Sequence, residues 1–194
     1  MESNSILTFL YPLLESLSKG SLIRKVMIFL FRLIGVLIFI GGIYFFINAI
    51  GHAPDFWFVI LFILVLIASL ISIQIWFYRA NAISQLDDSD FTVISIFSHV
   101  FRAFGEIYAL YTLVISIGGV LILWFSNYVY NLMEFTRYIP LVGLDSTFVG
   151  GILFFIASIV AAFFVLLLSY FLAENILVLV EIAKNTRPLR KSSE

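Results

Sequence analysis

Residues 56–78 read FWFVILFILVLIASLISIQIWFY and contain no charged residue. Asp55 precedes this run and Arg79 follows it. A helix needs roughly 20 consecutive apolar residues to cross the hydrocarbon core of a bilayer, so the run is long enough to span a membrane. Because its apolar residues are continuous and do not alternate with polar ones, the run favours a helix over a half-buried strand.

Three further apolar runs lie before and after this one. Together they predict an all-α membrane protein with four transmembrane helices in two helical hairpins. Residues 51–55, GHAPD, contain the breakers glycine and proline and predict a tight turn between the first two helices. The expected spans are residues 26–50, 56–79, 106–133 and 146–180.

The composition supports the same class. Hydrophobic residues make up 62% of the 194 residues and charged residues 12%, against about 45–50% and about 25% in soluble domains. The net charge of −1 provides no basic field for nucleic acid, and the absence of cysteine excludes disulfides and thiolate sites. We expect one membrane domain over residues 26–187, after an N-terminal segment (1–25) and before a polar tail (188–194).

Two stretches have the pattern of amphipathic helices at the membrane surface. In residues 1–25, apolar side chains recur at helical spacing among polar ones. In the central loop, residues 87–90 read DDSD, which is typical of a helix start, and aromatic and aliphatic residues follow. We expect interfacial helices at both places, the second leading into the third span.

The distribution of Lys and Arg predicts the orientation. Ten of the 11 basic residues flank the spans on one side, and only Arg137 lies on the other. Basic residues mark the cytoplasmic side, so both termini are expected there. Trp57 and Trp124 then fall at the outer interface and Trp76 at the inner one, as in aromatic belts.

A short internal similarity raises the possibility of a parallel duplication. Residues 31–35 read FRLIG and residues 101–105 read FRAFG, each at the start of a hairpin. Chance is the alternative interpretation, because the chain has 22 phenylalanines.

Charged residues gather at the cytoplasmic ends of the expected helices. They form a candidate charged ring of Arg32, Arg79, Arg102, Glu106, Glu174 and Glu181. Such a ring could act as a gate, a lipid head-group site or a docking site. Alternatively, its arginines extend to the interface and its glutamates only mark helix ends.

Small residues give a second candidate set, for helix packing. Closely approaching helices in lipid favour glycine, alanine and serine. The set comprises Gly41, Gly42, Gly118, Gly119, Gly150, Gly151, Ala157 and Ala161. They pack the four helices of one chain or form a face between copies.

Catalytic chemistry has little support in the sequence. The two histidines, His52 and His99, lie in different loops, and no metal, nucleophile or phosphate-loop motif is present. No span has a charged residue near its centre, which argues against an ion-driven transporter. We expect no catalytic, cofactor or metal site.

One resemblance concerns the end of the chain. Residues 181–187 read EIAKNTR after a span that contains Glu174. This ending resembles that of small bacterial membrane-hairpin proteins of uncharacterised function. The resemblance implies a bacterial inner-membrane protein and indicates no substrate.

These observations predict a non-enzymatic membrane scaffold or accessory subunit that acts through its cytoplasmic face, with a protein partner there and lipid around its helices. The alternative is a small oligomeric channel or facilitator, with the charged ring as its cytoplasmic mouth. A lipid-handling enzyme is a third interpretation, which the missing catalytic cluster disfavours.

Overall fold

The computed structural model describes residues 20–86, 91–128 and 148–191. They form four long helices, α2 (Ser21–Ile50), α3 (Phe56–Ser84), α4 (Thr92–Phe125) and α6 (Phe148–Lys191), and these residues contain no strand. All four helices are long and apolar enough to cross a membrane. The prediction of an all-helical protein with four long apolar helices able to span a membrane is therefore confirmed for the described residues.

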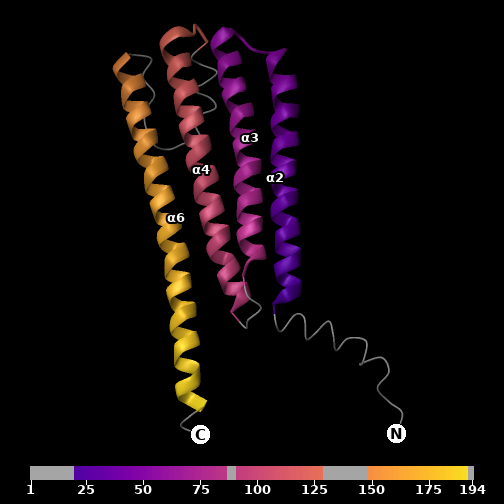
Figure 1. Cartoon of the computed structure of the whole chain (residues 1–194). Coiled ribbons are helices and arrows are strands. Elements are labelled where there is room, and N and C mark those ends of the chain that lie inside the picture. Colours follow the sequence, from indigo (N-terminus) through magenta and orange to yellow (C-terminus); the bar gives the residue numbers. More distant parts are fainter. Residues whose placement is uncertain (1–19, 87–90, 129–147, 192–194) are drawn as a thin grey trace, which may run out of the picture.

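The four helices stand side by side in one layer (Figure 1). α3 packs between α2 and α4, and α6 packs on the other side of α4. No Cα atom of α6 comes within 8 Å of one in α2 or α3. Because the first and last helices do not meet, the chain forms an open layer and not a closed bundle. α2 and α6 leave most of their apolar surface uncovered.

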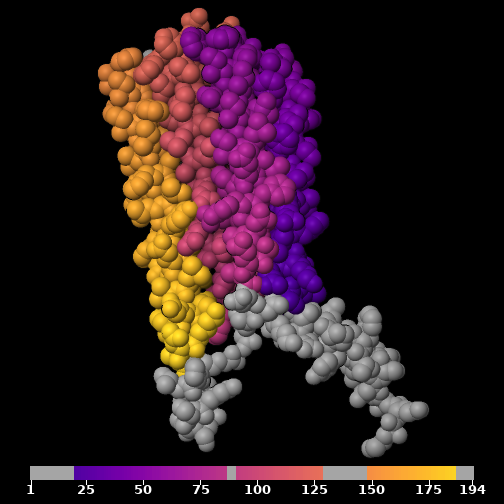
Figure 2. All heavy atoms as spheres, in the orientation of Figure 1, coloured from indigo at the N-terminus to yellow at the C-terminus, as the bar shows by residue number. Residues whose placement is uncertain are grey.

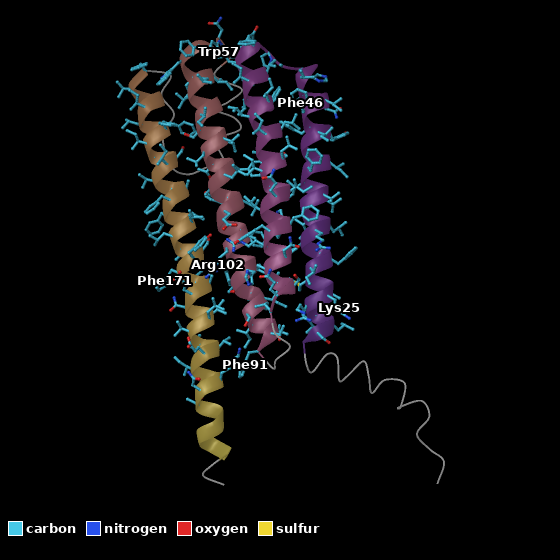
Figure 3. All side chains as sticks on the ribbon, in the orientation of Figure 1. Lys25, Phe46, Trp57, Phe91, Arg102 and Phe171 are labelled. Atoms are coloured by element: carbon cyan, nitrogen blue, oxygen red, sulfur yellow. The ribbon has the colours of Figure 1, made fainter. Side chains whose placement is uncertain are left out.

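Successive helices run in opposite directions, so each end of the layer has a distinct composition (Figure 1). One end of the layer contains the N-terminal ends of α2 and α4 and the C-terminal ends of α3 and α6. We call this the basic end, because all the described Lys and Arg residues lie in the half of the layer nearest to it. The opposite end, with the turn at residues 51–55, is the hairpin end. Figure 3 shows Lys25 near the basic end and Trp57 at the hairpin end.

Asp55 organises the hairpin end. Its Oδ1 atom accepts hydrogen bonds from the backbone N–H groups of Trp57 at 3.0 Å and Phe58 at 3.3 Å, which makes it the N-cap of α3. Its Oδ2 atom accepts from the hydroxyl of Ser126, which follows α4. One carboxylate therefore joins the α2–α3 turn to the end of α4.

The core is divided along the layer into two clusters. Near the basic end, Phe31 of α2 packs edge-on against Trp76 of α3, with ring centroids 4.8 Å apart. Near the hairpin end, a second cluster joins α3, α4 and α6 around the fully buried Ile122. Between them, the helices approach closely through small side chains.

The third predicted span begins earlier than expected. Residues 92–105 belong to the same continuous helix as residues 106–125, and the described residues contain no separate interfacial helix there. On this part of α4, Ser95 and Ser98 are buried while Phe97, Phe101 and Phe104 are exposed. Large aromatic side chains on this part of α4 therefore face outward, and Ser95, Ile96, Ser98 and Ala103 face the neighbouring helices. The expected helix start at residues 87–90 and the N-terminal segment 1–19 lie outside the described residues.

The last helix also extends further than expected. The fourth predicted span ends at residue 180, whereas α6 continues through Pro188 to Lys191. A proline this close to the C-terminal end of a helix removes one backbone hydrogen bond, and only a few helical residues follow it. The C-terminal part of α6 extends beyond the ends of α2 and α3 (Figures 1 and 2).

Candidate functional site at the basic end

Three polar side chains from three helices meet inside the layer. Arg79 of α3 donates from Nε to Glu106 Oε2 at 3.1 Å and from Nη2 to Glu106 Oε1, which gives a two-pronged ion pair with α4. The hydroxyl of Tyr170 on α6 donates to Glu106 Oε1 at 2.5 Å and accepts from Arg79 Nη2 at 2.9 Å. We call these residues the Arg79 cluster. It links α3, α4 and α6 although α3 and α6 do not pack directly.

Glycine at position 105 brings the members of the cluster together. A Cβ atom at Gly105 would lie 2.4 Å from the Cβ of Ser169 on α6, so a larger residue would push the helices apart. Gly105 precedes Glu106, and Ser169 precedes Tyr170. The close contact between the two helix backbones therefore sets the distance between the glutamate and the tyrosine hydroxyl.

The Arg79 cluster is largely shielded from solvent. Arg79 is only 6% exposed, and the side chain of Glu106 is 19% exposed. A buried charge is costly unless a partner and hydrogen bonds compensate it. Glu106 accepts three hydrogen bonds, all from Arg79 and Tyr170, and so it is engaged in holding helices together. This arrangement is suited to fixing the positions of the helices.

Arg102 adds a second positive charge beside the cluster. Its guanidinium carbon lies 5.3 Å from the centroid of the Tyr170 ring, and that of Arg79 lies 6.0 Å from it, so two cations contact one aromatic ring. Figure 3 shows Arg102 in the part of the layer toward the basic end. With Glu106 as the counter-charge, two guanidinium groups and one carboxylate leave one positive charge in excess.

Two buried nitrogen atoms next to this excess charge have no hydrogen-bond partner among the described residues. They are Nε of Arg102 and Nδ1 of His99, one turn earlier on α4. Buried polar atoms are normally paired, so each such atom indicates a place where another polar group would be accommodated. The surroundings of Arg102 therefore favour an additional acceptor.

The six residues of the candidate charged ring do not come together as one group. Arg79, Arg102 and Glu106 meet at the Arg79 cluster. Arg32 is exposed on α2 and donates to the side chain of Asn81 at 3.2 Å. Glu174 and Glu181 are exposed on α6. In an open layer, the ends of α2 and α6 face away from each other, so a single chain cannot close a ring.

The candidate packing residues also differ in their surroundings. A Cβ atom on Gly42 would lie 2.2 Å from Ser69 Oγ, and Cβ atoms on Gly118 and Gly151 would meet Leu61 and Trp124 at 2.4 and 2.2 Å. These three glycines lie where two helices of the same chain are in contact. Gly41 is exposed, and a Cβ atom added to it would have nothing within 4 Å. Of the remaining candidates, Gly119 and Gly150 are buried, and Ala157 and Ala161 are half-buried.

Sequence reasoning missed two helix-contact glycines and the tyrosine of the cluster. Gly35 lies where a Cβ would come within 3.0 Å of Trp76 Cβ, and Gly105 makes the contact with Ser169. Both end the similar stretches 31–35 and 101–105, and that similarity could have drawn attention to them. The duplication itself stays a prediction. Tyr170 gave no signal, because nothing in its spacing indicates that it faces an arginine on α3.

Comparisons with protein-family models, curated proteins and solved structures found no match. The resemblance of residues 181–187 to bacterial membrane-hairpin proteins therefore stays a prediction.

Proposed function

We propose that the protein is a non-enzymatic accessory or scaffold subunit of a membrane complex and acts through the basic end of its helices. The observation that carries the proposal is the part of α6 that extends beyond the other helices. An open layer with apolar outer faces also favours this role, because it leaves room for further helices to pack. The residues of the Arg79 cluster are engaged in holding the layer together.

The proposed location is a bacterial inner membrane, with the basic end on the cytoplasmic side. The concentration of Lys and Arg toward one end supports this orientation through the positive-inside rule. Trp57 at the hairpin end and Trp76 toward the basic end are consistent with interfacial aromatic residues on both sides. Under this proposal, residues 80–105 and the end of α6 face the cytoplasm.

The proposed docking surface is the α6 extension, which we define as residues 178–186. Val178, Leu179 and Ile182 are 53%, 64% and 53% exposed. Glu181 and Lys184 lie beside them and are exposed as well. Apolar residues with adjacent charges of both signs are typical of a surface that a partner helix covers, since the charges add specificity to apolar contact.

Site-specific photo-cross-linking in native membranes tests this proposal. We would replace Leu179 with p-benzoylphenylalanine and, as a matched control, Phe164, which is 64% exposed in the middle of α6. The expected result is an adduct with a different polypeptide of defined mass from position 179 only. Glu181→Lys should reduce its yield at unchanged expression. Equal labelling from both positions, or no protein adduct at 179, would refute the docking surface.

A small oligomeric channel is the second candidate function. It is favoured by Gly41, which is exposed on α2 with open space around it and so offers a close contact to a helix of another copy. In that case charged residues from several copies would make the cytoplasmic mouth. An adduct of two identical chains in the cross-linking experiment would support this candidate over the first.

A further inference from the structure

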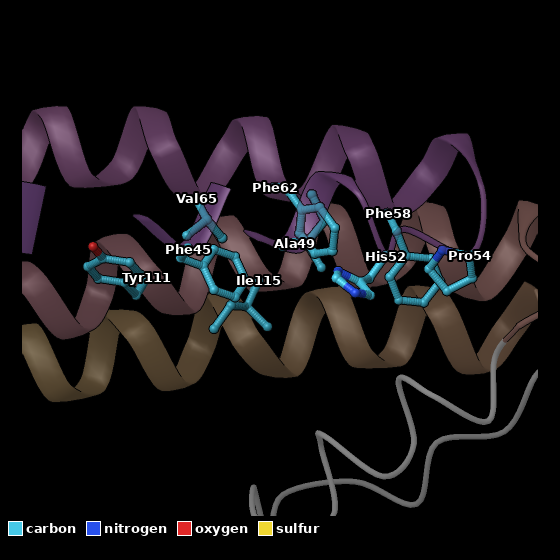
Figure 4. A pocket seen from close by; sticks show the side chains of 10 residues that line it. Phe45, Ala49, His52, Pro54, Phe58, Phe62, Val65, Tyr111 and Ile115 are labelled. Atoms are coloured by element: carbon cyan, nitrogen blue, oxygen red, sulfur yellow. The ribbon is translucent and has the colours of Figure 1, made fainter. Parts of the chain in front are cut away.

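An apolar groove occupies the half of the layer nearest to the hairpin end (Figure 4). Its volume is about 530 Å³, and α2, α3 and α4 all contribute to its walls. The rings of Phe45, Phe58, Phe62 and Tyr111 line it, and Ala49 provides the space between them. The groove lies nearer to the hairpin end of the layer than the Arg79 cluster does.

The depth of the groove corresponds to one leaflet of a bilayer. The groove extends from Pro54, in the turn before α3, to Val65, and the helical part of this stretch, Phe56 to Val65, is roughly 14 Å long at 1.5 Å per residue. Half of a hydrocarbon core about 30 Å thick is about 15 Å. All three helices that line the groove are candidate membrane spans. A chain lying in the groove would therefore run from the interface to the middle of the membrane.

The hydroxyl of Tyr111, at the deep end of the groove, is already paired. The hydroxyl of Ser69 donates to the backbone oxygen of Val65 at 2.9 Å and lies 3.3 Å from the hydroxyl of Tyr111. Neither hydroxyl needs a polar ligand. An occupant of this part of the groove is consequently a purely apolar group that ends near Tyr111.

The outer end of the groove has one polar side chain available to a ligand. His52 is exposed, and its Nδ1 atom lies 2.8 Å from the backbone oxygen of Asn48. A carbonyl oxygen only accepts, so Nδ1 carries the proton, and Nε2 of the neutral ring is then an acceptor. A group that binds there must donate a hydrogen bond. Head groups that carry an N–H or O–H group, such as ethanolamine, have such a donor, and choline does not.

We propose that the groove binds one acyl chain of a phospholipid, with a hydrogen-bond-donating head group such as ethanolamine at His52. Burial of the acyl chain gives it little preference for the groove over the surrounding lipid, because that lipid is equally apolar. The selectivity comes instead from packing of the chain against the aromatic walls and from the hydrogen bond at the interface. This site is independent of the proposed docking surface.

Native mass spectrometry of the delipidated full chain tests the site, with palmitoyl-oleoyl phosphatidylethanolamine and the matching phosphatidylcholine as probes. Wild type should retain one ethanolamine lipid about fivefold better than the choline lipid, the ratio expected for one ordinary hydrogen bond. Ala49→Trp fills the groove and should abolish retention of both lipids. Ile47→Trp is the matched control on α2, where the side chain is 64% exposed, and it should retain lipid as wild type does.

His52→Ala separates the two parts of the site. It should keep the acyl chain bound and remove the preference for ethanolamine. Equal retention by Ala49→Trp and Ile47→Trp, or no lipid bound to wild type, would overturn the proposal. A lipid-free mass of two chains in wild type would assign the groove to a second copy and would overturn it as well.

A second measurement uses unmodified protein, so it does not depend on a variant that folds. Phosphatidylethanolamine with a photoreactive diazirine in its acyl chain is incorporated with the protein into vesicles, and the labelled residues are mapped by peptide mass spectrometry. Label should concentrate at groove residues such as Ala49 and Phe62 over exposed Ile47. Uniform labelling of all lipid-facing residues would show that the groove holds no particular chain.

Discussion

Arg79 and Glu106 form a two-pronged ion pair between α3 and α4, and Tyr170 of α6 hydrogen-bonds to both. Apolar helices in lipid have little hydrophobic drive to select particular neighbours or depths. A buried ion pair provides that selection, because any other arrangement leaves a charge without its partner. We therefore regard the Arg79 cluster as the feature that fixes the relative positions of three of the four described helices.

Removal of one partner of this ion pair should be costly. Arg79→Leu leaves the carboxylate of Glu106 without its main counter-charge, and we expect a loss of about 3–5 kcal/mol in the free energy of unfolding. The measurement is unfolding in mixed detergent micelles followed by circular dichroism. Arg32→Leu is the control, because its exposed hydrogen bond to Asn81 should contribute at most about 1 kcal/mol.

The double variant Arg79→Leu/Glu106→Leu tests whether Arg79 and Glu106 are coupled. With both charges removed, no unpaired ion remains, and the double variant should be more stable than Arg79→Leu alone. If the two substitutions simply add, the residues are not coupled and the assigned role of the pair is wrong.

The hydroxyl of Tyr170 should contribute separately. Tyr170→Phe keeps the ring that Arg102 contacts and removes two hydrogen bonds to charged groups, so we expect a loss of about 1.5–3 kcal/mol. Tyr108→Phe on α4, where the side chain is 47% exposed, is the matched control and should change stability little. The same unfolding assay measures both, and equal effects would mean that the hydroxyl of Tyr170 does not hold the helices.

Two adjacent glycines on α2 should respond to alanine with opposite signs. Gly42→Ala forces a Cβ to within 2.2 Å of Ser69 Oγ and 2.5 Å of its Cβ, and should cost about 1–3 kcal/mol through displacement of α3. Gly41→Ala has open space and should gain about 0.5–1 kcal/mol, since alanine is the better helix former. The measurement is the unfolding of both variants and wild type under the same conditions. Equal stability of the two variants would show that α2 and α3 do not pack at Gly42.

The cap at Asp55 gives a test at the hairpin end. Asp55→Ala loses the two backbone hydrogen bonds that start α3 and the bond from Ser126, and should cost about 0.5–2 kcal/mol. Asp55→Asn retains an oxygen acceptor and should remain within a few tenths of a kcal/mol of wild type. Thermal unfolding of the three proteins provides the comparison, and indistinguishable losses in both variants would contradict the capping role.

The four helices could be predicted from the sequence because each apolar run is long and has charged residues at its ends. The second predicted span, 56–79, and the observed helix Phe56–Ser84 begin at the same residue. The start of α4 was less predictable. The polar residues among residues 92–105 predict an interfacial helix that leads into the third span, and the structure joins this segment and the span in one continuous helix.

The open arrangement and the complete site could not be predicted. Helices that are apolar on all sides have no stripe that identifies their neighbours, so the sequence does not indicate which pairs are in contact. Arg79, Arg102 and Glu106 stood out as charges at span ends. Tyr170 did not, because a tyrosine near a helix end is an ordinary interfacial residue until its neighbour on α3 is known.

The central claim is that the open layer works as a subunit beside a different protein. The most direct measurement is native mass spectrometry of the protein extracted from its own membranes in a mild detergent. We predict a complex that contains one 22.1 kDa chain and a different polypeptide. A mass that is an integer multiple of 22.1 kDa, or that of one chain alone, would contradict the claim, and the multiple would favour the oligomeric channel.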